Sequence, residues 1–337
     1  MKDFAFPKMR RAFLAGIAAL AASGGLALYA SATNAQPAPM PVSVGIIGST
    51  VEYYPIFVAD KKGFFEKNGV KVDVVTTGGS ARSAQMTATG AVNVGSSSWL
   101  DSVRAIDGGA SIKVVANSLH TATTMLIGAK NIKSIAELKG KRVSMGGAKD
   151  ITNVWWMAMA QKAGLNGEKD VEVIFGGGTP ARFAALVAGG VEAAAVATPL
   201  AFKAMQEGYT NLGLMGPFLP NVPYMSWHAN AAWAAANREA MVRFVRANNQ
   251  AIEFIYNPVN RNEAAAILAA ASNVPIEEAL RTHDLVVEIK GFAPNSAGTA
   301  AGVDGTLKVL SEFGDVKAAK PATFYYDDTY VRAAGAN

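Results

Sequence analysis

Residues 41–75 read "PVSVGIIGSTVEYYPIFVADKKGFFEKNGVKVDVV" and contain the main signals of the architecture. The first nine residues of this stretch are a β-branched run ending near glycine, which predicts a buried strand. Residues 54–62 are expected to be helical, because Pro55 suits a first helical turn and Gly63 suits a helix end. The pair Asn68-Gly69 then makes a turn into the strand "VKVDVV". The same order of strand, glycine-rich turn, helix and strand recurs along the chain, which predicts an α/β fold with parallel sheets.

The first 35 residues have the pattern of a cleaved export signal. Basic residues precede an apolar run over 12–30, and Thr33 and Ala35 supply small residues for cleavage after Ala35. The string "RRAFL" resembles a twin-arginine signal, so the general secretory and twin-arginine routes both stay open. The alternative is an uncleaved anchor helix. We expect cleavage, and therefore a soluble periplasmic protein.

Charge and cysteine content exclude several classes of protein. The chain has 31 Lys and Arg against 26 Asp and Glu. Without the first 35 residues, which hold four basic residues and one acid, 27 and 25 remain, a net charge of +2. This small excess does not indicate a nucleic-acid surface. With no cysteine, disulfides, thiol catalysis, cysteine-bound metals and a lipoprotein anchor are excluded.

One segment of the chain is repeated. "GGSARSAQMTATGAVNVG" begins at Gly78, and "GGTPARFAALVAGGVEAA" begins at Gly177. Setting Arg82 on Arg182 matches the two strings at an offset of 100, which slips by one residue further on. The alternative is that any two alanine-rich helices feeding strands look alike. On either reading each half holds a βαβ unit, and two such lobes leave a cleft between them.

Enzyme and cofactor motifs are lacking. The three histidines have no metal-ligand spacing, and neither a G-x-S-x-G elbow nor a phosphate loop is present. Gly176, Gly178 and Ala181 fit the dinucleotide pattern G-x-G-x-x-A, but residues 196–200 lack the acid that should hold the ribose. We therefore expect no cofactor, no metal and no catalytic residue.

Polar residues gather where the predicted strands end. Ligands of open parallel sheets bind at the carboxyl ends of the strands, beside helix N-termini that favour anions. The candidates are Ser49, Thr50, Tyr53 and Tyr54 after the first strand; Ser97, Ser98 and Trp99; His120; Thr152 and Asn153; and Thr198. Hydroxyl groups and free amides suit an oxyanion, although each Ser or Thr could instead be an ordinary helix cap.

Aromatic residues at element boundaries refine this prediction. Tyr53, Trp99 and Trp227 lie where a side chain can reach a cleft. Together with His120 they favour a larger organic anion, such as an aromatic carboxylate or sulfonate.

The sequence resembles the periplasmic substrate-binding proteins of ABC importers for nitrate, sulfonate and taurine, which share their fold with binders of thiamine-pyrimidine precursors. The resemblance rests on five blocks in order: "YYPIFVADKKGFFEKNGVKVDVV", "TATGAVNVGSSS", "IKSIAELKGKRVSMG", "AALVAGGVEAAAV" and "REAMVRFVRANNQAIEFIYNP". The blocks cover nearly all of the chain after the export signal.

The resemblance implies a type II periplasmic binding protein fold, with two Rossmann-like lobes joined by a two-strand hinge. Lobe one is then residues 42–122 plus 230–337, and lobe two is 123–229. The family's ligand contacts, carried onto this chain, are Ser49, Thr50, Tyr53, Tyr54, Ser97, Ser98, Trp99, His120, Gly147, Thr152, Asn153, Thr198 and Trp227. Asn93 and Glu192 stand where the family has an acidic turn residue.

We thus expect a monomeric receptor that closes over a small organic anion and passes it to a membrane permease. A binder of a neutral pyrimidine, an enzyme on the same fold and a receptor feeding a membrane sensor remain the alternatives.

Overall fold

The computed structural model describes residues 38–219 and 221–335. The export signal expected over 1–35 lies outside these residues. Among the described helices, none combines the length and apolarity needed to cross a membrane.

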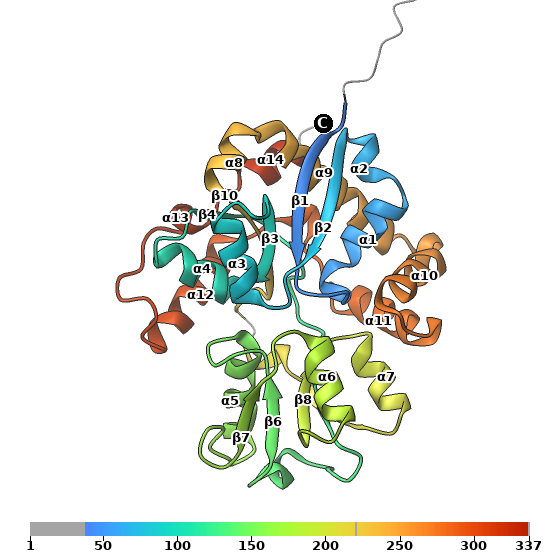
Figure 1. Ribbon diagram of the computed structural model, residues 1–337, viewed down its shortest axis with the longest axis vertical. Helices are drawn as coiled ribbons and strands as arrows, with labels where there is room; N and C mark the ends of the chain where they lie inside the picture. Colours follow the sequence, from blue (N-terminus) through green and yellow to red (C-terminus); the bar gives the residue numbers. More distant parts are fainter. Residues whose placement is uncertain (1–37, 220, 336–337) are drawn as a thin grey trace, which may run out of the picture. The chain divides into compact units, whose positions relative to one another are not determined.

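Two five-stranded sheets organise the described chain (Figure 1). The first sheet has the strand order β2 (Val70–Thr76), β1 (Met40–Ile46), β3 (Val94–Ser98), β10 (Met225–Asn230) and β4 (Ile112–Asn117). Strands β1, β2 and β3 pair in parallel, as the alternating pattern predicts. Strand β10 is antiparallel to both its neighbours.

The second sheet repeats this plan. Its order is β7 (Glu172–Phe175), β6 (Arg142–Met145), β8 (Ala193–Val196), β5 (Met125–Gly128) and β9 (Thr210–Leu214). Strand β6 is parallel to β7 and β8, whereas β5 is antiparallel to both its neighbours. In each sheet the antiparallel strand is the one that enters from the other sheet.

The chain passes between the sheets twice, after β4 and again before β10. These two crossovers are hydrogen-bonded to one another: Tyr224 N donates to His120 O at 2.9 Å, and Met225 N to Leu119 O at 2.8 Å. We call the parts built on the two sheets the first-sheet side and the second-sheet side. The exact lobe boundaries 42–122, 123–229 and 230–337 stay a proposal.

The helix after the first strand forms as its sequence predicts. Helix α1 (Tyr54–Lys61) has Pro55 in its first turn, and Gly63 follows with a φ of 67°, which glycine adopts without strain. A 3-10 turn η1 (Val51–Tyr53) leads into α1, and α2 (Phe64–Lys67) follows it. Val70 then begins β2, after the expected turn at Asn68-Gly69.

Further helices cover both sheets. On the first-sheet side they are α3 (Ser80–Ala88), α4 (Trp99–Asp107), α8 (Ala231–Ala236), α9 (Arg238–Tyr256), α10 (Arg261–Ser272), α11 (Ile276–Glu288), α12 (Ala300–Glu312), α13 (Ala322–Tyr325) and α14 (Thr329–Gly335). On the second-sheet side they are α5 (Ile151–Lys162), α6 (Thr179–Val187) and α7 (Leu200–Gln206). Short 3-10 turns occur at η2 (Ile135–Leu138), η3 (Gly216–Phe218), η4 (Pro258–Asn260) and η5 (Pro294–Ser296).

The repeated segment has one register throughout. Helices α3 and α6 begin at Ser80 and Thr179, and strands β3 and β8 begin at Val94 and Ala193, so both pairs are 99 residues apart. The helix offset of 100 read from the sequence is therefore wrong by one residue. In the observed register Arg182 corresponds to Ser83, not to the exposed Arg82.

Asn93 and Glu192 also correspond in this register. Asn93 Oδ1 accepts from Ser43 N in β1, and Glu192 Oε2 accepts from Arg142 N in β6, each at 2.9 Å. Each side chain ties the loop before one strand to the neighbouring strand of its own sheet.

Candidate functional site

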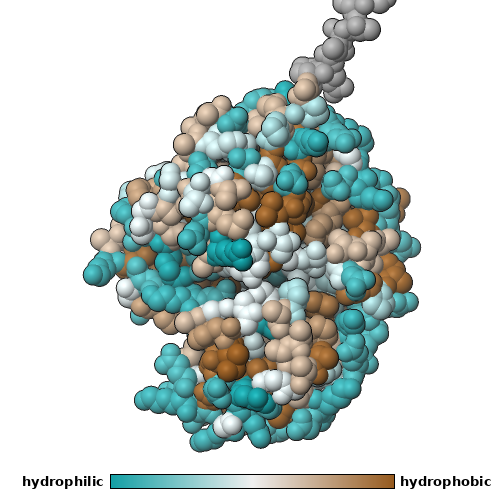
Figure 2. All heavy atoms as spheres, in the orientation of Figure 1, coloured by the Kyte–Doolittle hydropathy of each residue, from teal (hydrophilic) through white to brown (hydrophobic). Residues whose placement is uncertain are grey.

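A cavity of about 60 Å³ lies between the carboxyl edges of the two sheets. The loop after β1 and the start of α3 line it from the first-sheet side. The starts of α5 and α6 line it from the second-sheet side, and the second crossover supplies Tyr224 and Met225. In Figure 2, pale and teal residues gather in the hollow between the two sides. The cavity thus has the position at which parallel sheets bind ligands.

Arg182 is the only basic side chain that lines the cavity, within the described residues. It is 4% exposed and belongs to the first turn of α6. Its Nε donates to Ala195 O at 2.6 Å, one terminal nitrogen donates to Gly177 O, and the other donates to Thr179 Oγ1 at 3.1 Å. Because a guanidinium has five N–H groups, two remain for a ligand.

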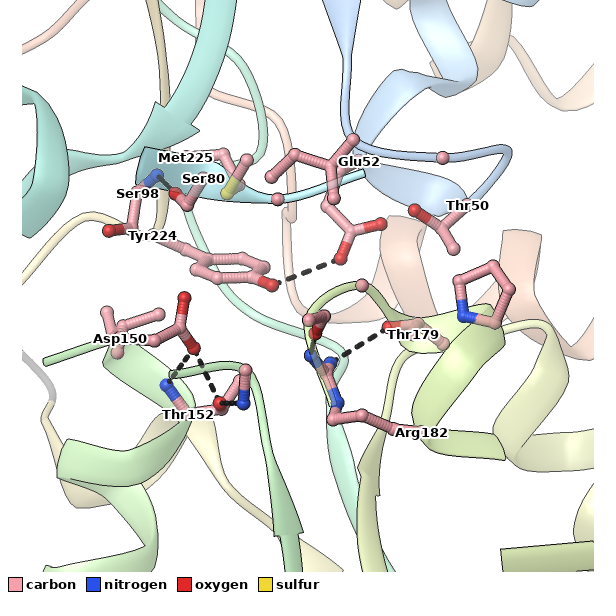
Figure 3. A pocket seen from close by; sticks show the side chains of 18 of the residues that line it. Thr50, Glu52, Ser80, Ser98, Asp150, Thr152, Thr179, Arg182, Tyr224 and Met225 are labelled. Atoms are coloured by element: carbon pink, nitrogen blue, oxygen red, sulfur yellow. Dashed lines mark hydrogen bonds between the residues drawn. The ribbon is translucent and has the colours of Figure 1, made fainter. Parts of the chain in front are cut away.

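Glu52 faces Arg182 from the first-sheet side (Figure 3). It is 4% exposed, and its Oε1 accepts from the Tyr224 hydroxyl at 3.1 Å. Burial raises the pKa of Glu52, while the neighbouring Thr50 hydroxyl, the Tyr224 hydroxyl and the charge of Arg182 lower it in part. Among the described residues, the carboxylate oxygen Oε2 has no hydrogen-bond partner.

A second acid, Asp150, caps helix α5 at the cavity. Its Oδ1 accepts from Thr152 N at 2.9 Å and from Thr152 Oγ1 at 2.5 Å. The Ser98 hydroxyl, at the cavity wall, caps α4 and donates to Asp101, which lies behind the wall, at 2.8 Å. Burial, followed by the charge of Asp150, raises the pKa of Asp101 to about 6. An acidic side chain therefore lines the cavity from each side, Glu52 from the first-sheet side and Asp150 from the second-sheet side, and the basic Arg182 lines it from the second-sheet side.

Backbone contacts hold the two sides together around the cavity. Gly178 N donates to Gly78 O at 3.1 Å, and Val51 N donates to Thr198 O at 3.2 Å. These bonds bring the N-termini of α3 and α6 to the same space, and both helix ends favour negative charge. The conformation is thus closed around a small volume.

Four residues predicted from the sequence line this cavity: Thr50, Tyr53, Ser98 and Thr152. Tyr53 and Thr152 also support the walls, because the Tyr53 hydroxyl accepts from Ile47 N at 3.1 Å and Thr152 Oγ1 accepts from Gly146 N at 2.8 Å.

Three of the predicted aromatic residues do not reach the cavity. Tyr54 lies on the other face of the loop, where its hydroxyl meets His283 Nδ1 at 3.1 Å. Trp227, in β10, packs its ring against Tyr53 at 5.9 Å and belongs to the core. Trp99 is fully buried and donates from Nε1 to Asn117 Oδ1 at 2.7 Å. Of the aromatic residues expected to favour a large ligand, only Tyr53 lines the cavity.

The remaining predicted residues lie elsewhere: Ser49, Ser97, His120, Gly147, Asn153 and Thr198. Ser97 points under the sheet to Ser102, with 2.7 Å between the hydroxyls. Thr198 donates its hydroxyl to Thr123 at 2.9 Å. Asn153 closes its own loop by donating to Ala148 O at 2.8 Å.

The other three of these six residues, Ser49, Gly147 and His120, do not line the cavity either. Ser49 is exposed and lines a separate groove beside α1 and α10. Gly146, not Gly147, forms the wall at the end of β6. His120 contributes backbone to the crossover, and burial lowers the pKa of its imidazole.

The sequence reasoning missed Glu52, Asp150 and Arg182, the three charged residues of the cavity. A signal for Arg182 was present, because a basic residue in the first turn of a helix opposes the helix dipole. A local rule broken in this way is typical of functional positions. Glu52 had a weaker signal, because it is an acid between the predicted residues Thr50 and Tyr53.

The described residues contain no group of three His, Cys, Asp or Glu side chains placed to hold a metal. Within the described residues, His228 Nδ1 lies 3.3 Å from two buried serine hydroxyls, those of Ser97 and Ser102. These three residues lie beneath the first sheet, and none of them lines the cavity.

The fold is that of the periplasmic binding proteins. The alkanesulfonate-binding protein of Xanthomonas axonopodis pv. citri, solved with bound MOPS, is 19% identical; the match covers 86% of this chain and 99% of that one, with a TM-score of 0.70. The periplasmic nitrate-binding protein of Synechocystis PCC 6803 is 16% identical, with 88% of each chain covered and a TM-score of 0.74. A DszB variant in complex with biphenyl-2-sulfinic acid is 13% identical, with 87% and 98% covered and a TM-score of 0.64.

The chain belongs to the family described as NMT1/THI5 like, whose sequence model matches residues 50–260. The matched region includes most of the cavity wall, from Thr50 to Met225. No curated protein matches the chain. The resemblance drawn from the five sequence blocks is confirmed at the level of family and fold.

Proposed function

We propose that the protein is an exported solute receptor of an ABC uptake system, and that its ligand is a small organic anion, a sulfonate or carboxylate. The single observation that carries this proposal is the cavity between the two sides, where the buried Arg182 lies beside the N-termini of α3 and α6. A guanidinium and two helix ends favour an oxyanion.

Reversible binding accounts for the site better than catalysis does. His228 and the two serines that contact it lie beneath the first sheet, away from the cavity. The charged side chains at the cavity belong to the two sides that a hinge motion would bring together. A ligand that bridges them favours the closed form by its differential affinity for that form. An enzyme built on this fold remains the alternative, since a DszB variant in complex with biphenyl-2-sulfinic acid shares the fold.

The cavity volume favours a compact ligand. A cavity of about 150 Å³ accommodates benzene in a well-studied engineered case, and this one has about 60 Å³. Aromatic carboxylates and sulfonates would require the two sides to separate further. We therefore place short aliphatic anions first in the panel.

A binding panel tests the proposal. Purified protein is titrated calorimetrically with ethanesulfonate, propionate, nitrate, benzoate and an aminopyrimidine alcohol. Saturable one-to-one binding of an organic anion is expected. Binding of the pyrimidine alone would favour the neutral-ligand alternative, and turnover of a bound compound would favour an enzyme.

Export to the periplasm and delivery to the permease are tested separately. Expressed from its full sequence in a bacterium with a periplasm, the protein should be recovered there as a monomer beginning at Gln36. An intact-mass measurement of the periplasmic fraction checks this, and recovery of the uncleaved chain in the membrane would support the anchor alternative. Uptake of the bound anion should require both the receptor and its permease.

A further inference from the structure

The charges of the cavity do not match those of a simple anion. Two acids and one base line it among the described residues: Glu52, Asp150 and Arg182. An anion that satisfied Arg182 would bring a third negative charge into a space of about 60 Å³. In a low-dielectric space such repulsion is strong.

Glu52 is a buried acid of the cavity with one oxygen unpartnered among the described residues. It is 4% exposed, and Tyr224 satisfies only one of its two oxygens. The other oxygen, Oε2, lacks a partner within the described chain. A buried carboxylate oxygen left unpaired is destabilising, so a donor is expected there.

The arginine of the cavity does not supply this donor. Arg182 directs three of its N–H groups to Ala195, Gly177 and Thr179, all on the second-sheet side. None of the ion pairs found within the described residues joins it to Glu52. In Figure 3 the Glu52 carboxylate and the Arg182 guanidinium lie on opposite sides of the space.

Asp150 adds a second acceptor. Its Oδ1 is used by Thr152, and its other oxygen points into the space between the two sides in Figure 3. Two acceptors and one bidentate donor therefore converge on one small cavity from three different elements.

We propose that Glu52 selects a compact ligand that carries a protonated nitrogen beside its oxyanion, the nitrogen donating to Glu52 Oε2 while the oxyanion meets Arg182. Asp150 supplies a further acceptor for the same nitrogen. This inference rests on the proposed function and narrows its ligand class from anions to amphoteric ions.

A protonated Glu52 is the competing arrangement. Its O–H would donate to the oxyanion, and the site would then prefer a plain anion. The two arrangements differ in what an amino group on the ligand does to affinity, so matched ligand pairs separate them.

The test is calorimetric titration of the purified protein with ethanesulfonate against taurine, propionate against β-alanine, and propylamine alone. We expect each amino compound to bind at least about tenfold more tightly than its plain partner, the effect of one hydrogen bond between charged groups. We expect propylamine to bind more weakly than either amino acid, because it leaves Arg182 unpaired.

Variants assign the effect to Glu52. Glu52→Gln should remove most of the preference for the amino compounds and leave the plain anions bound at least as tightly as before. Glu278→Gln is the matched control, because Glu278 is also buried with an unpartnered Oε2 but lies in α11, away from the cavity. Asp150→Asn, which preserves a good helix cap, should weaken the preference in part.

The outcomes distinguish this inference from the proposed function. If plain anions bind as tightly as their amino partners, or if Glu52→Gln keeps the preference, the inference is wrong while the receptor stands. If none of the anions or amino compounds binds, the proposed function itself fails, and the inference with it. Should Glu52→Gln not fold, the wild-type preference and Asp150→Asn still decide.

Discussion

Replacing Arg182 by methionine should separate ligand binding from folding. Methionine fills much of the same volume but removes the charge and every N–H group. Two N–H groups of Arg182 remain free for a ligand after its bonds to Ala195, Gly177 and Thr179. At roughly 1.5 kcal/mol or more for each charge-assisted bond, losing both should weaken anion binding by at least about 100-fold.

The same change should reduce stability much less than three lost hydrogen bonds suggest. Removing a buried charge also removes its desolvation penalty, so we expect a net loss of about 1–3 kcal/mol in the free energy of unfolding. Arg182→Lys keeps the positive charge but not the planar guanidinium. Its affinity for the anion should lie between those of the wild type and Arg182→Met.

Calorimetric titration measures the affinity, and urea denaturation measures the stability of the same samples. Arg82→Met is the matched control, since Arg82 belongs to the corresponding helix α3 but is exposed. It should change neither quantity. If Arg182→Met folds and binds the anion as tightly as the wild type, Arg182 does not hold the oxyanion, and the reasoning is refuted.

Three further predictions concern stability. Burial raises the pKa of Asp101 to about 6, so the folded state holds its proton at higher pH than the unfolded state. Between pH 4 and 6 the wild type should therefore lose up to about 3 kcal/mol relative to Asp101→Asn as pH rises, measured by urea denaturation at each pH; a constant difference would contradict this. Burial lowers the pKa of His228 to about 4, so stability should instead fall as pH drops from about 6.5 to 4, by up to about 3 kcal/mol relative to His228→Gln. An equally steep acid loss in that variant would show that another group is responsible. A Cβ on Gly95 would lie 2.2 Å from Thr87 Oγ1 and 2.6 Å from His228 Nε2, whereas one on Gly79 meets nothing within 4 Å. Gly95→Ala should therefore lower stability by about 3 kcal/mol or more and Gly79→Ala by much less, and equal thermal melts would count against the packing of α3 on β3.

Much of the fold was predictable because its signals are local. Pro55 and Gly63 bound the first helix, and α9 ends at Tyr256, two residues before Pro258, as breaker residues predict. The antiparallel strands β5 and β10 were not predictable in this way. Their partners lie far away in sequence, and the chain reaches them only through the crossovers.

The site was predictable where a residue ends a strand and caps a helix, as Ser98 does. One residue earlier, Ser97 already faces the helices that cover β3, because strand side chains alternate between the two faces. The predicted site also rested on hydroxyl and aromatic groups and left out charged side chains. Glu52 and Arg182 line the same cavity only after two segments, 130 residues apart, fold against each other.

The most direct test of the central claim is native mass spectrometry of the purified protein with the panel of anions and amino compounds. We expect one ligand per chain, bound saturably, released unchanged on denaturation and lost in Arg182→Met. A protein that retains none of these compounds, or that releases one of them chemically altered, would contradict the claim that this cavity belongs to a receptor.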